Sequence, residues 1–318
     1  MGVYHFMGVG RSVGAVTCAV DYIEKALQMS TKPNPPESIQ RLLKNSGGIN
    51  HSEKNAGSIE ALVLFSSPEV VERKLAAFDY IGNASPCDVR TEIEQALVKI
   101  WKSFDPKEKR KVYWCKLNIN NFQECLQRVI RVTYHFSAPN RQGKEIWCNL
   151  TGGANVINLA LMSMAQLTNK SSKQYIITQG KEYEKFINVP NAIAMNPNID
   201  SYFNVFPFIQ TSIDQINVYK ILELLKENPL TTNDLYSRYK NFNDNLDLRS
   251  FTQVHMTKIY GQGYTNRDRQ TDINSITREG LDFLEQMDNL IIDCHMPSLY
   301  DDPNFDEDSK TWLDQSTI

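Results

Sequence analysis

The chain has 318 residues, of which 41% are hydrophobic and 22% charged, and its net charge at pH 7 is −3. These values are ordinary for globular proteins and allow two domains. No bulk positive charge attracts nucleic acid or acidic membranes, and no apolar run reaches the roughly 18 residues that span a bilayer. The six cysteines contain no CxxC pair, which favours free buried thiols over a zinc site. We therefore expect a cytoplasmic protein in which any polyanion site is local.

Residues 1–210 alternate apolar strands with amphipathic helices. The predicted strands are Val3–Val9, Ile59–Ser66, Lys111–Ile119, Ile146–Leu150, Gln174–Thr178 and Lys185–Val189, the last two forming a closing pair. The predicted helices are Val13–Met29, Glu69–Tyr80, Asp88–Phe104 with Asp88 as its cap, Asn121–Phe136 and Ala154–Leu167. This alternation predicts an α/β fold with a Rossmann-like, mainly parallel sheet covered on both faces. Residues 30–58 are polar and predict a surface insertion with a short helix at Ser38–Lys44.

Residues 211–290 change to a helical pattern with one hairpin. The predicted helices are Ile213–Glu227, Asn233–Tyr239, Ser250–Ile259 and Thr277–Met287, and Tyr264–Ile276 supplies the two strands. This order is typical of a winged helix-turn-helix domain. Residues 213–287 hold nine Lys or Arg and eleven Asp or Glu, a balance that favours a dimerisation or pocket-covering role over DNA binding. The acidic tail, 291–318, is expected to be a solvated or disordered end.

Two glycine-bearing loops follow predicted strands. The first spans Gly8–Gly14 and the second Thr151–Asn155. Glycine lets a backbone turn tightly and approach a ligand, and the helix after each loop offers free N–H groups to a phosphate. In the first loop, Arg11 adds a cation able to fork onto phosphate and Ser12 adds a hydroxyl. Because the carboxyl ends of parallel strands share one edge of a sheet, the loops are expected to form one ligand crevice.

The first loop departs from a dinucleotide-binding fingerprint. Gly8, Gly10 and Gly14 are spaced as GxGxxxG, one residue longer than GxGxxG, and no lone acid follows the second strand. The NAD hypothesis therefore lacks its ribose ligand. A turn without any ligand and an ordinary nucleotide-binding Rossmann protein stay open as alternatives. His5 lies inside the first strand and is expected to be a core or interface residue.

The Ser-bearing turn after the first strand, the strand ending in Thr151-Gly152-Gly153 and the C-terminal winged helix resemble CARF (CRISPR-associated Rossmann fold) proteins. The resemblance covers most of residues 1–290. It implies a homodimer whose ligand-binding edges meet and, as ligand, cyclic oligoadenylate, the second messenger of type III CRISPR antiviral defence. Such a ring is polyanionic and symmetric, which suits a two-fold pocket lined by glycine loops. The implied ligand contacts are Gly8, Gly10, Gly14, Ser66, Ser67, Thr151, Gly152, Gly153 and Ala154.

Some CARF proteins are ring nucleases, which cut their ligand without metal or other cofactor. The cut is an in-line attack of a ribose 2′-hydroxyl on the adjacent phosphate, which needs positioning and charge stabilisation. Ser12, Arg11 and Asn155 match the positions that would act in this step. The family motif often continues Thr-Gly-Gly-Thr-Lys, whereas Ala154 and Asn155 stand here, which weighs against cleavage more than against binding.

Two hypotheses follow from the resemblance. The first is a ring nuclease, and the second is a transcription regulator or sensor that responds to cyclic oligoadenylate without catalysis. The Arg–His spacing of HEPN ribonucleases also occurs, in Arg128 with His135 and in Arg249 with His255. Neither pair lies in a HEPN-like helical domain, so both are attributed to chance.

Overall fold

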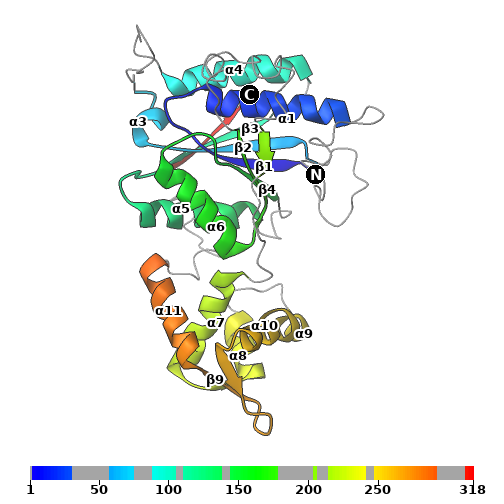
Figure 1. Ribbon diagram of the computed structural model, residues 1–318, viewed down its shortest axis with the longest axis vertical. Coiled ribbons are helices and arrows are strands. Elements are labelled where there is room, and N and C mark those ends of the chain that lie inside the picture. The colour runs from blue at the N-terminus through cyan, green and yellow to red at the C-terminus, as the bar shows by residue number, and fades with distance from the viewer. Residues whose placement is uncertain are drawn as a thin grey trace.

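The computed structural model describes residues 2–30, 57–74, 88–104, 110–137, 144–177, 203–205, 214–240, 247–291 and 312–318. They form a seven-stranded sheet between helices and, below it in Figure 1, a smaller helical unit with a three-stranded sheet. The predicted fold class, α/β with a Rossmann-like and mostly parallel sheet, is confirmed. None of the described helices has the length and apolar character that a membrane crossing requires.

The large sheet has the strand order β10-β3-β2-β1-β4-β5-β6. Its strands are β1 (Val3–Gly8), β2 (Ile59–Ser66), β3 (Lys111–Lys116), β4 (Glu145–Asn149), β5 (Ser171–Ile177), β6 (Phe203–Val205) and β10 (Leu313–Thr317). The pairs among β1 to β5 are parallel, and β6 and β10 join antiparallel at the two edges. The chain winds one way from β1 to β3 and the other way from β4 to β5. The neighbours β1 and β4 therefore flank the topological switch point, where open α/β sheets bind ligands.

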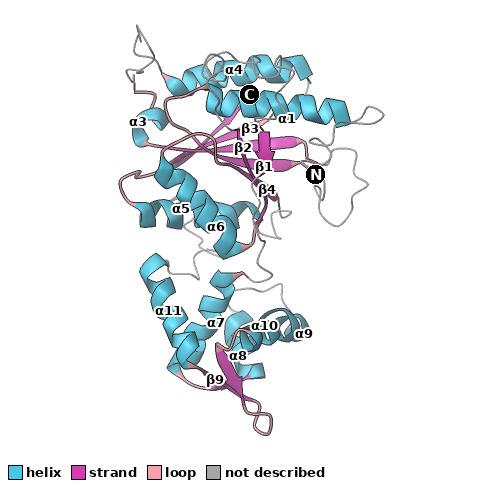
Figure 2. Ribbon diagram, in the orientation of Figure 1, coloured by secondary structure: helices cyan, strands magenta, loops and turns pink. Residues whose placement is uncertain are grey.

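Helices cover both faces of this sheet, as Figure 2 shows. The helices α1 (Gly14–Ser30) and α4 (Val89–Phe104) pack on one face, and α5 (Phe122–Ser137) and α6 (Asn155–Thr168) pack on the other. Each layer closes a separate apolar core, with the fully buried Trp114 and Trp147 under α1 and α4 and Phe6 and Phe65 under α5 and α6. Strands buried on both sides explain why their sequences are continuously apolar.

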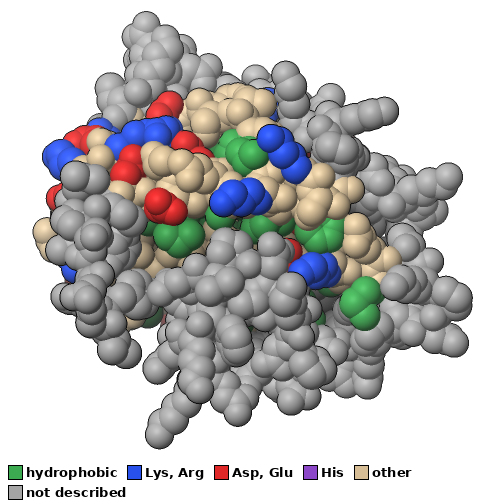
Figure 3. Space-filling model, turned by 90° about the horizontal axis from the view of Figure 1, so that it is seen from above, with side chains coloured by type: hydrophobic (Ala, Val, Ile, Leu, Met, Phe, Trp, Pro, Cys, Tyr) green, Lys and Arg blue, Asp and Glu red, His purple; other side chains and the backbone are tan. Residues whose placement is uncertain are grey.

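The outer surface over α1 and α4 carries both signs of charge (Figure 3). Exposed Glu92, Lys99 and Lys102 lie on α4, and acidic side chains gather with Lys and Arg at one end of the described surface. Mixed charges of this kind are typical of a solvated face and provide no single-sign field for a polyanion.

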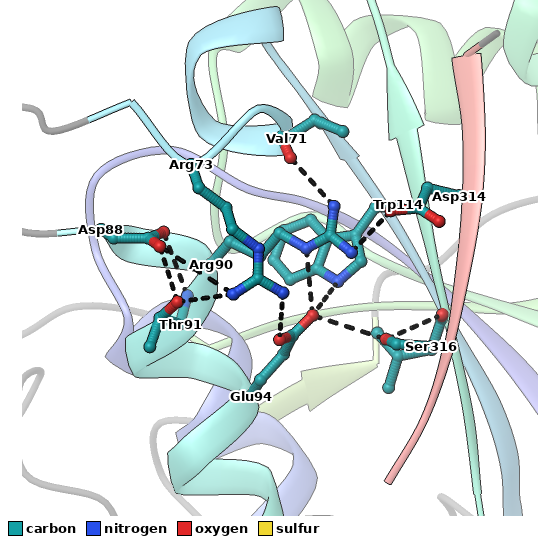
Figure 4. A network of polar contacts seen from close by, with 10 residues as sticks. Val71, Arg73, Asp88, Arg90, Thr91, Glu94, Trp114, Asp314 and Ser316 are labelled. Carbon is teal, nitrogen blue, oxygen red and sulfur yellow. Dashed lines mark hydrogen bonds and ion pairs between the residues drawn. The ribbon is translucent and has the colours of Figure 1, made fainter.

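The last residues of the chain were expected to form a solvated or disordered end, whereas residues 312–318 are ordered and contribute the edge strand β10, whose side chains are partly exposed. Trp312 is buried and β10 pairs with β3 along its whole length. The polar contacts in Figure 4 hold the strand, because Arg90 donates to Asp314 at 2.7 Å and to Glu94 at 3.0 Å, while Ser316 donates to Glu94. The acidic composition of the tail gives no sign of this strand, because the charge of Asp314 is balanced by Arg90, which lies on α4.

The smaller unit, residues 214–291, is connected to the large sheet at both of its ends. It contains α7 (Gln215–Glu227), β7 (Leu230–Thr231), α8 (Thr232–Lys240), α9 (Leu248–Ser250), a π-helical turn at Phe251–Met256, α10 (Thr257–Gly261), β8 (Thr265–Arg267), β9 (Ile273–Ile276) and α11 (Arg278–Ile291). It follows β6 and precedes β10, which are the two opposite edge strands of the large sheet. The chain after the domain boundary predicted at residue 290 therefore returns to the large sheet, to which it contributes β10.

Several predicted elements differ from the structure in extent. Of the helix predicted at Glu69–Tyr80, the structure describes one turn, α3 (Pro68–Val71), which ends before Arg73, a residue in a left-handed conformation with φ of 58°. Residues 75–80 of this prediction lie outside the described residues. The partner of β5 is β6, and the strand predicted at Lys185–Val189 lies outside the described residues, as does the helix at Ser38–Lys44 with most of the 30–58 insertion. The cap predicted at Asp88 is confirmed, since its side chain accepts from the N–H of Thr91. The side chain of Thr277 accepts from the N–H of Gly280 in the same way.

Candidate functional site

The two glycine loops lie against each other backbone to backbone at the switch point. A Cβ added to Gly8 would lie 2.6 Å from the Gly152 carbonyl oxygen, and one added to Gly152 would lie 2.8 Å from the Gly8 oxygen. Gly153 has a φ of +85°, and its added Cβ would lie 2.8 Å from the backbone of Gly8. These glycines are therefore required by the contact between the loops, because any larger side chain would separate them.

Gly10 differs from these three glycines. Its added Cβ would meet nothing closer than the Cα of Gly153, at 3.5 Å, which is an ordinary contact. The fold itself tolerates a side chain at this position. A backbone without a side chain at this position is what close approach of a ligand would need.

Two helices begin at this edge, and both are suited to an anion. Gly14 begins α1 and is buried, and Asn155 begins α6. The first N–H groups of a helix have no acceptor inside it and carry the positive end of its dipole. Neither helix has an acidic residue in its first turn, and Ala154, the N-cap of α6, offers no side-chain acceptor.

Three polar side chains of the predicted site stand at the start of these helices. Arg11 is exposed and has no hydrogen-bond or ion-pair partner among the described residues. Asn155 is exposed as well, while the Oγ atom of Ser12 is buried and without a partner in the described part of the chain. Buried polar atoms normally have a hydrogen-bond partner, so an orphan such as Ser12 Oγ needs an explanation.

A second buried polar atom without a partner lies next to the first loop. The Oδ1 atom of Asn158, in the first turn of α6, is buried, has no hydrogen-bond partner among the described residues and would be 3.1 Å from a Cβ on Gly8. The sequence analysis did not select Asn158, since a lone Asn in an apolar helix gives no signal. The structure thus leaves two acceptor-bearing side chains, Ser12 and Asn158, unsatisfied next to the paired loops.

Other residues of the predicted site hold the loops in place. The hydroxyl of Ser66 donates to the carbonyl of Val9 at 2.7 Å and is fully buried, so Ser66 supports the backbone of the first loop. The Oγ1 of Thr151 accepts the N–H of Ile177 at 2.8 Å, which ties the second loop to β5. Ser67 is half-buried at the start of α3 and hydrogen-bonds with Glu69.

Asn149 is a further supporting residue that the sequence analysis missed. It is buried at the end of β4, where its Oδ1 accepts from the N–H of Thr151 at 2.9 Å. Its Nδ2 donates to the carbonyl of Ala15, in the first turn of α1, at 3.3 Å. Asn149 therefore joins the β4 loop to the helix that follows the β1 loop, and the available signal was a polar residue ending an otherwise apolar strand.

The remaining titratable candidates belong to the core. His5 is fully buried and hydrogen-bonds through Nδ1 with the Tyr175 hydroxyl at 3.0 Å. Burial, and secondly the charge of Arg110, lower the pKa of His5 to about 3, so the ring is neutral and acts in packing. The described cysteines, Cys18, Cys115, Cys125 and Cys148, are free and buried, and burial raises the pKa of each thiol.

The two Arg–His pairs do not form ribonuclease-like sites. Arg128 donates to the carbonyl of Lys116 at 2.6 Å and lies over the Trp312 ring, so it helps to hold the C-terminal strand. His255 is buried in the π-helical turn of the smaller unit, while Arg249 is exposed. Both roles agree with the attribution to chance.

The chain is similar in sequence to a curated protein and in part to a solved structure. No family model matches the sequence. A curated relative, an uncharacterized protein of Archaeoglobus fulgidus, is 30% identical over 192 residues, which cover 56% of this chain and 58% of that protein. The chain thus spans a little over half the length of this relative.

A solved structure, Enterococcus italicus Csm6 bound to cyclic hexa-2′-fluoro-hexa-dAMP, matches 83% of this chain and 56% of its own chain. The sequence identity is 13% and the TM-score is 0.39. A similarity at this level does not define the function of the chain.

Proposed function

We propose that the chain binds cyclic oligoadenylate at the paired loops after β1 and β4. The observation that carries this proposal is the pair of buried orphans, Ser12 Oγ and Asn158 Oδ1, at the point where two helix N-termini converge. Phosphate oxygens suit the helix N-termini and the guanidinium of Arg11. A nucleotide also brings ribose hydroxyls and an exocyclic amine, which are donors for the two orphan oxygens. The motif resemblance to CARF proteins supplies the ligand class.

We further propose that the bound ring is cut without metal. The ribose 2′-oxygen would attack the adjacent phosphorus in line, the bond from phosphorus to the 5′-oxygen would break, and the 2′ proton would pass through water to the 5′-oxygen. The products are linear, with a 2′,3′-cyclic phosphate at one end. Arg11 would stabilise the charge on the phosphoryl oxygens, and Ser12 and Asn155 would orient the attacking and bridging atoms. Because none of these three is a base near neutral pH, cleavage is expected to be slow.

The test of this activity is incubation of the purified protein, with chelator and no metal, with cyclic tri-, tetra- and hexa-adenylate. Mass spectrometry of the products should find linear fragments with 2′,3′-cyclic phosphate ends. Arg11→Ala should reduce the rate, whereas Arg278→Ala, the same change at an exposed position on α11, should not. An intact ring at stoichiometric protein would eliminate the nuclease and leave binding to be measured separately.

Homodimer formation belongs to this proposal, because a symmetric ring fits two copies of the site. Support comes from α6, which borders the site and contains no charged residue, while its Leu159 is 54% exposed. An uncharged helix face with an exposed leucine suits burial against a second copy. Leu159→Lys should convert a dimer to a monomer in sedimentation velocity, and Leu281→Lys, at a leucine that is 43% exposed on α11, should leave it unchanged.

A second candidate is a ligand-responsive transcription regulator. It is favoured by the element order of the smaller unit, which suits a winged helix, and by exposed Arg249 and Gln253 on the third helical segment and Arg269 on the hairpin tip. Such positions reach the major groove and the backbone in winged-helix proteins. A gel shift with promoter DNA at physiological salt should show a ligand-dependent complex weakened by Arg249→Ala. Ligand binding without any DNA complex would eliminate the regulator.

A further inference from the structure

The end of α6 opposite the candidate site is in contact with the smaller unit. The helix has 14 residues, which corresponds to a rod of about 21 Å. It ends at Asn169, a left-handed C-cap with φ of 53°, and Lys170 follows immediately. Figure 1 shows α6 lying directly above α7, and the two helices are in contact. One rigid element therefore joins the crevice to the smaller unit.

The contact is made by a buried cluster around Asp214. This residue is the N-cap of α7, and its side chain accepts from the N–H groups of Ile216 at 3.1 Å and Asn217 at 3.3 Å. The hydroxyl of Tyr134, on α5, donates to the same carboxylate at 2.8 Å. Nζ of Lys170 lies 3.8 Å from the carboxylate and 5.8 Å from the centre of the Tyr134 ring. Three segments of the chain thus converge on one carboxylate.

The geometry of this cluster makes it sensitive to small shifts. Burial raises the pKa of Asp214 to about 6, and the charge of Lys170 and the hydrogen bond from Tyr134 oppose that rise. A buried carboxylate is stable only while its partners are in place, and loss of one partner is costly. The pKa of His255, in the π-helical turn, is lowered mainly by burial, then by the charge of Lys258, and also by the charge of Lys170. Lys170 therefore acts electrostatically on two parts of the smaller unit.

We propose that Lys170, Tyr134 and Asp214 couple occupancy of the crevice to the attachment of α7. This inference rests on the proposed function, because it needs a ligand at the α6 N-terminus. A ligand bound to the first N–H groups of α6 that moves the helix against α5 changes the distance from Lys170 to Asp214. Since Asp214 caps α7, the start of the smaller unit responds. Such coupling is reciprocal, so weakening the cluster also changes ligand affinity by the coupling factor.

The test is amide hydrogen exchange of residues 215–227 in the full chain, with and without saturating cyclic tetra-adenylate. Wild-type protein should show a ligand-dependent change in exchange at the start of α7. Tyr134→Phe removes one hydroxyl and should abolish this change while the ligand still binds. Tyr219→Phe is the matched control, because Tyr219 lies on α7 itself but hydrogen-bonds with Glu223 and Asp288. This control should keep the ligand-dependent change.

The outcomes separate the two proposals. If Tyr134→Phe binds the ring and shows the same exchange change as wild-type, the coupling is wrong and the binding proposal survives. If wild-type protein binds none of the three ring sizes, the proposed function fails and the coupling fails with it. Should Tyr134→Phe not fold, as judged by its thermal melt, Lys170→Gln provides the same comparison. Retention of the change in Lys170→Gln would then overturn the coupling.

Discussion

The loops after β1 and β4 look alike in sequence but differ in how their groups are used. In the β4 loop the side chain of Thr151 and the N–H of Thr151 are both hydrogen-bonded, and Gly152 and Gly153 are pressed against Gly8. In the β1 loop Arg11 is exposed, Ser12 Oγ has no partner among the described residues, and Gly10 has room for a side chain. The β4 loop therefore serves as a scaffold, while the β1 loop presents the groups that would meet a ligand.

The largest expected effect is a loss of stability on substitution in the β4 loop. Gly153→Ala places a Cβ 2.8 Å from the backbone of Gly8 at a positive φ, and we expect a loss of about 3 kcal/mol of unfolding free energy from the two causes together. Chemical denaturation measures it. Gly10→Ala is the control, which should change stability by less than about 0.5 kcal/mol and weaken ring binding. Equal losses in both variants would contradict the division between the loops.

A smaller loss of stability is expected at Asn149, which connects the two loops. Asn149→Ala removes two buried hydrogen bonds and leaves the N–H of Thr151 and the carbonyl of Ala15 without them. The expected cost is about 2 kcal/mol of stability, with weaker ligand binding as a consequence. Urea denaturation and equilibrium dialysis measure the two effects. Lost affinity with unchanged stability would mean that Asn149 contacts the ligand itself.

In the β1 loop, a substitution should lower the affinity for the ring and leave the stability unchanged. Arg11→Ala removes an exposed cation with no partner in the described chain, so the melting temperature should stay unchanged. The loss of a charge-assisted phosphate contact should weaken ring binding by roughly tenfold or more. Affinity should also depend less on salt concentration than in wild-type protein. A lower melting temperature with unchanged affinity would move Arg11 into the scaffold.

The smallest effect on the fold is expected at Ser12. Ser12→Ala removes an orphaned hydroxyl, so the stability should be unchanged or slightly increased. Ring binding should weaken, because the hydroxyl would no longer accept a hydrogen bond from the ring, and the rate of ring cleavage should fall further, because the hydroxyl also orients the reacting atoms. Single-turnover kinetics separate the two. A stability loss would show that Ser12 has a structural partner and would remove it from the mechanism.

Much of the fold follows from sequence, for physical reasons that particular elements illustrate. Strands such as Ile59–Ser66 can be predicted because burial on both faces makes them continuously apolar. The strand β10 cannot be predicted in this way, because the polar Asp314 and Ser316 indicate a strand only once their partners Arg90 and Glu94 are known. Local pattern cannot report a partner that lies more than 200 residues away in the chain.

The candidate site shows the same limit. The two loops and their shared edge follow from the order of strands and glycines. The distances between the loops determine which glycine is needed for packing and which leaves room for a ligand. The roles of Asn149 and Asn158 depend on their surroundings at the sheet edge. For Ser66, a hydroxyl predicted to face the ligand is used to support the backbone of Val9.

We propose above all that a phosphate of cyclic oligoadenylate binds between the β1 loop and the N-termini of α1 and α6. The most direct measurement is a crystal structure of the chain with cyclic tetra-adenylate, in the Ser12→Ala variant to slow cleavage. The account predicts a phosphate within hydrogen-bond distance of the Arg11 guanidinium and of the first N–H groups of α6. A ring bound elsewhere, with this crevice empty, would contradict it.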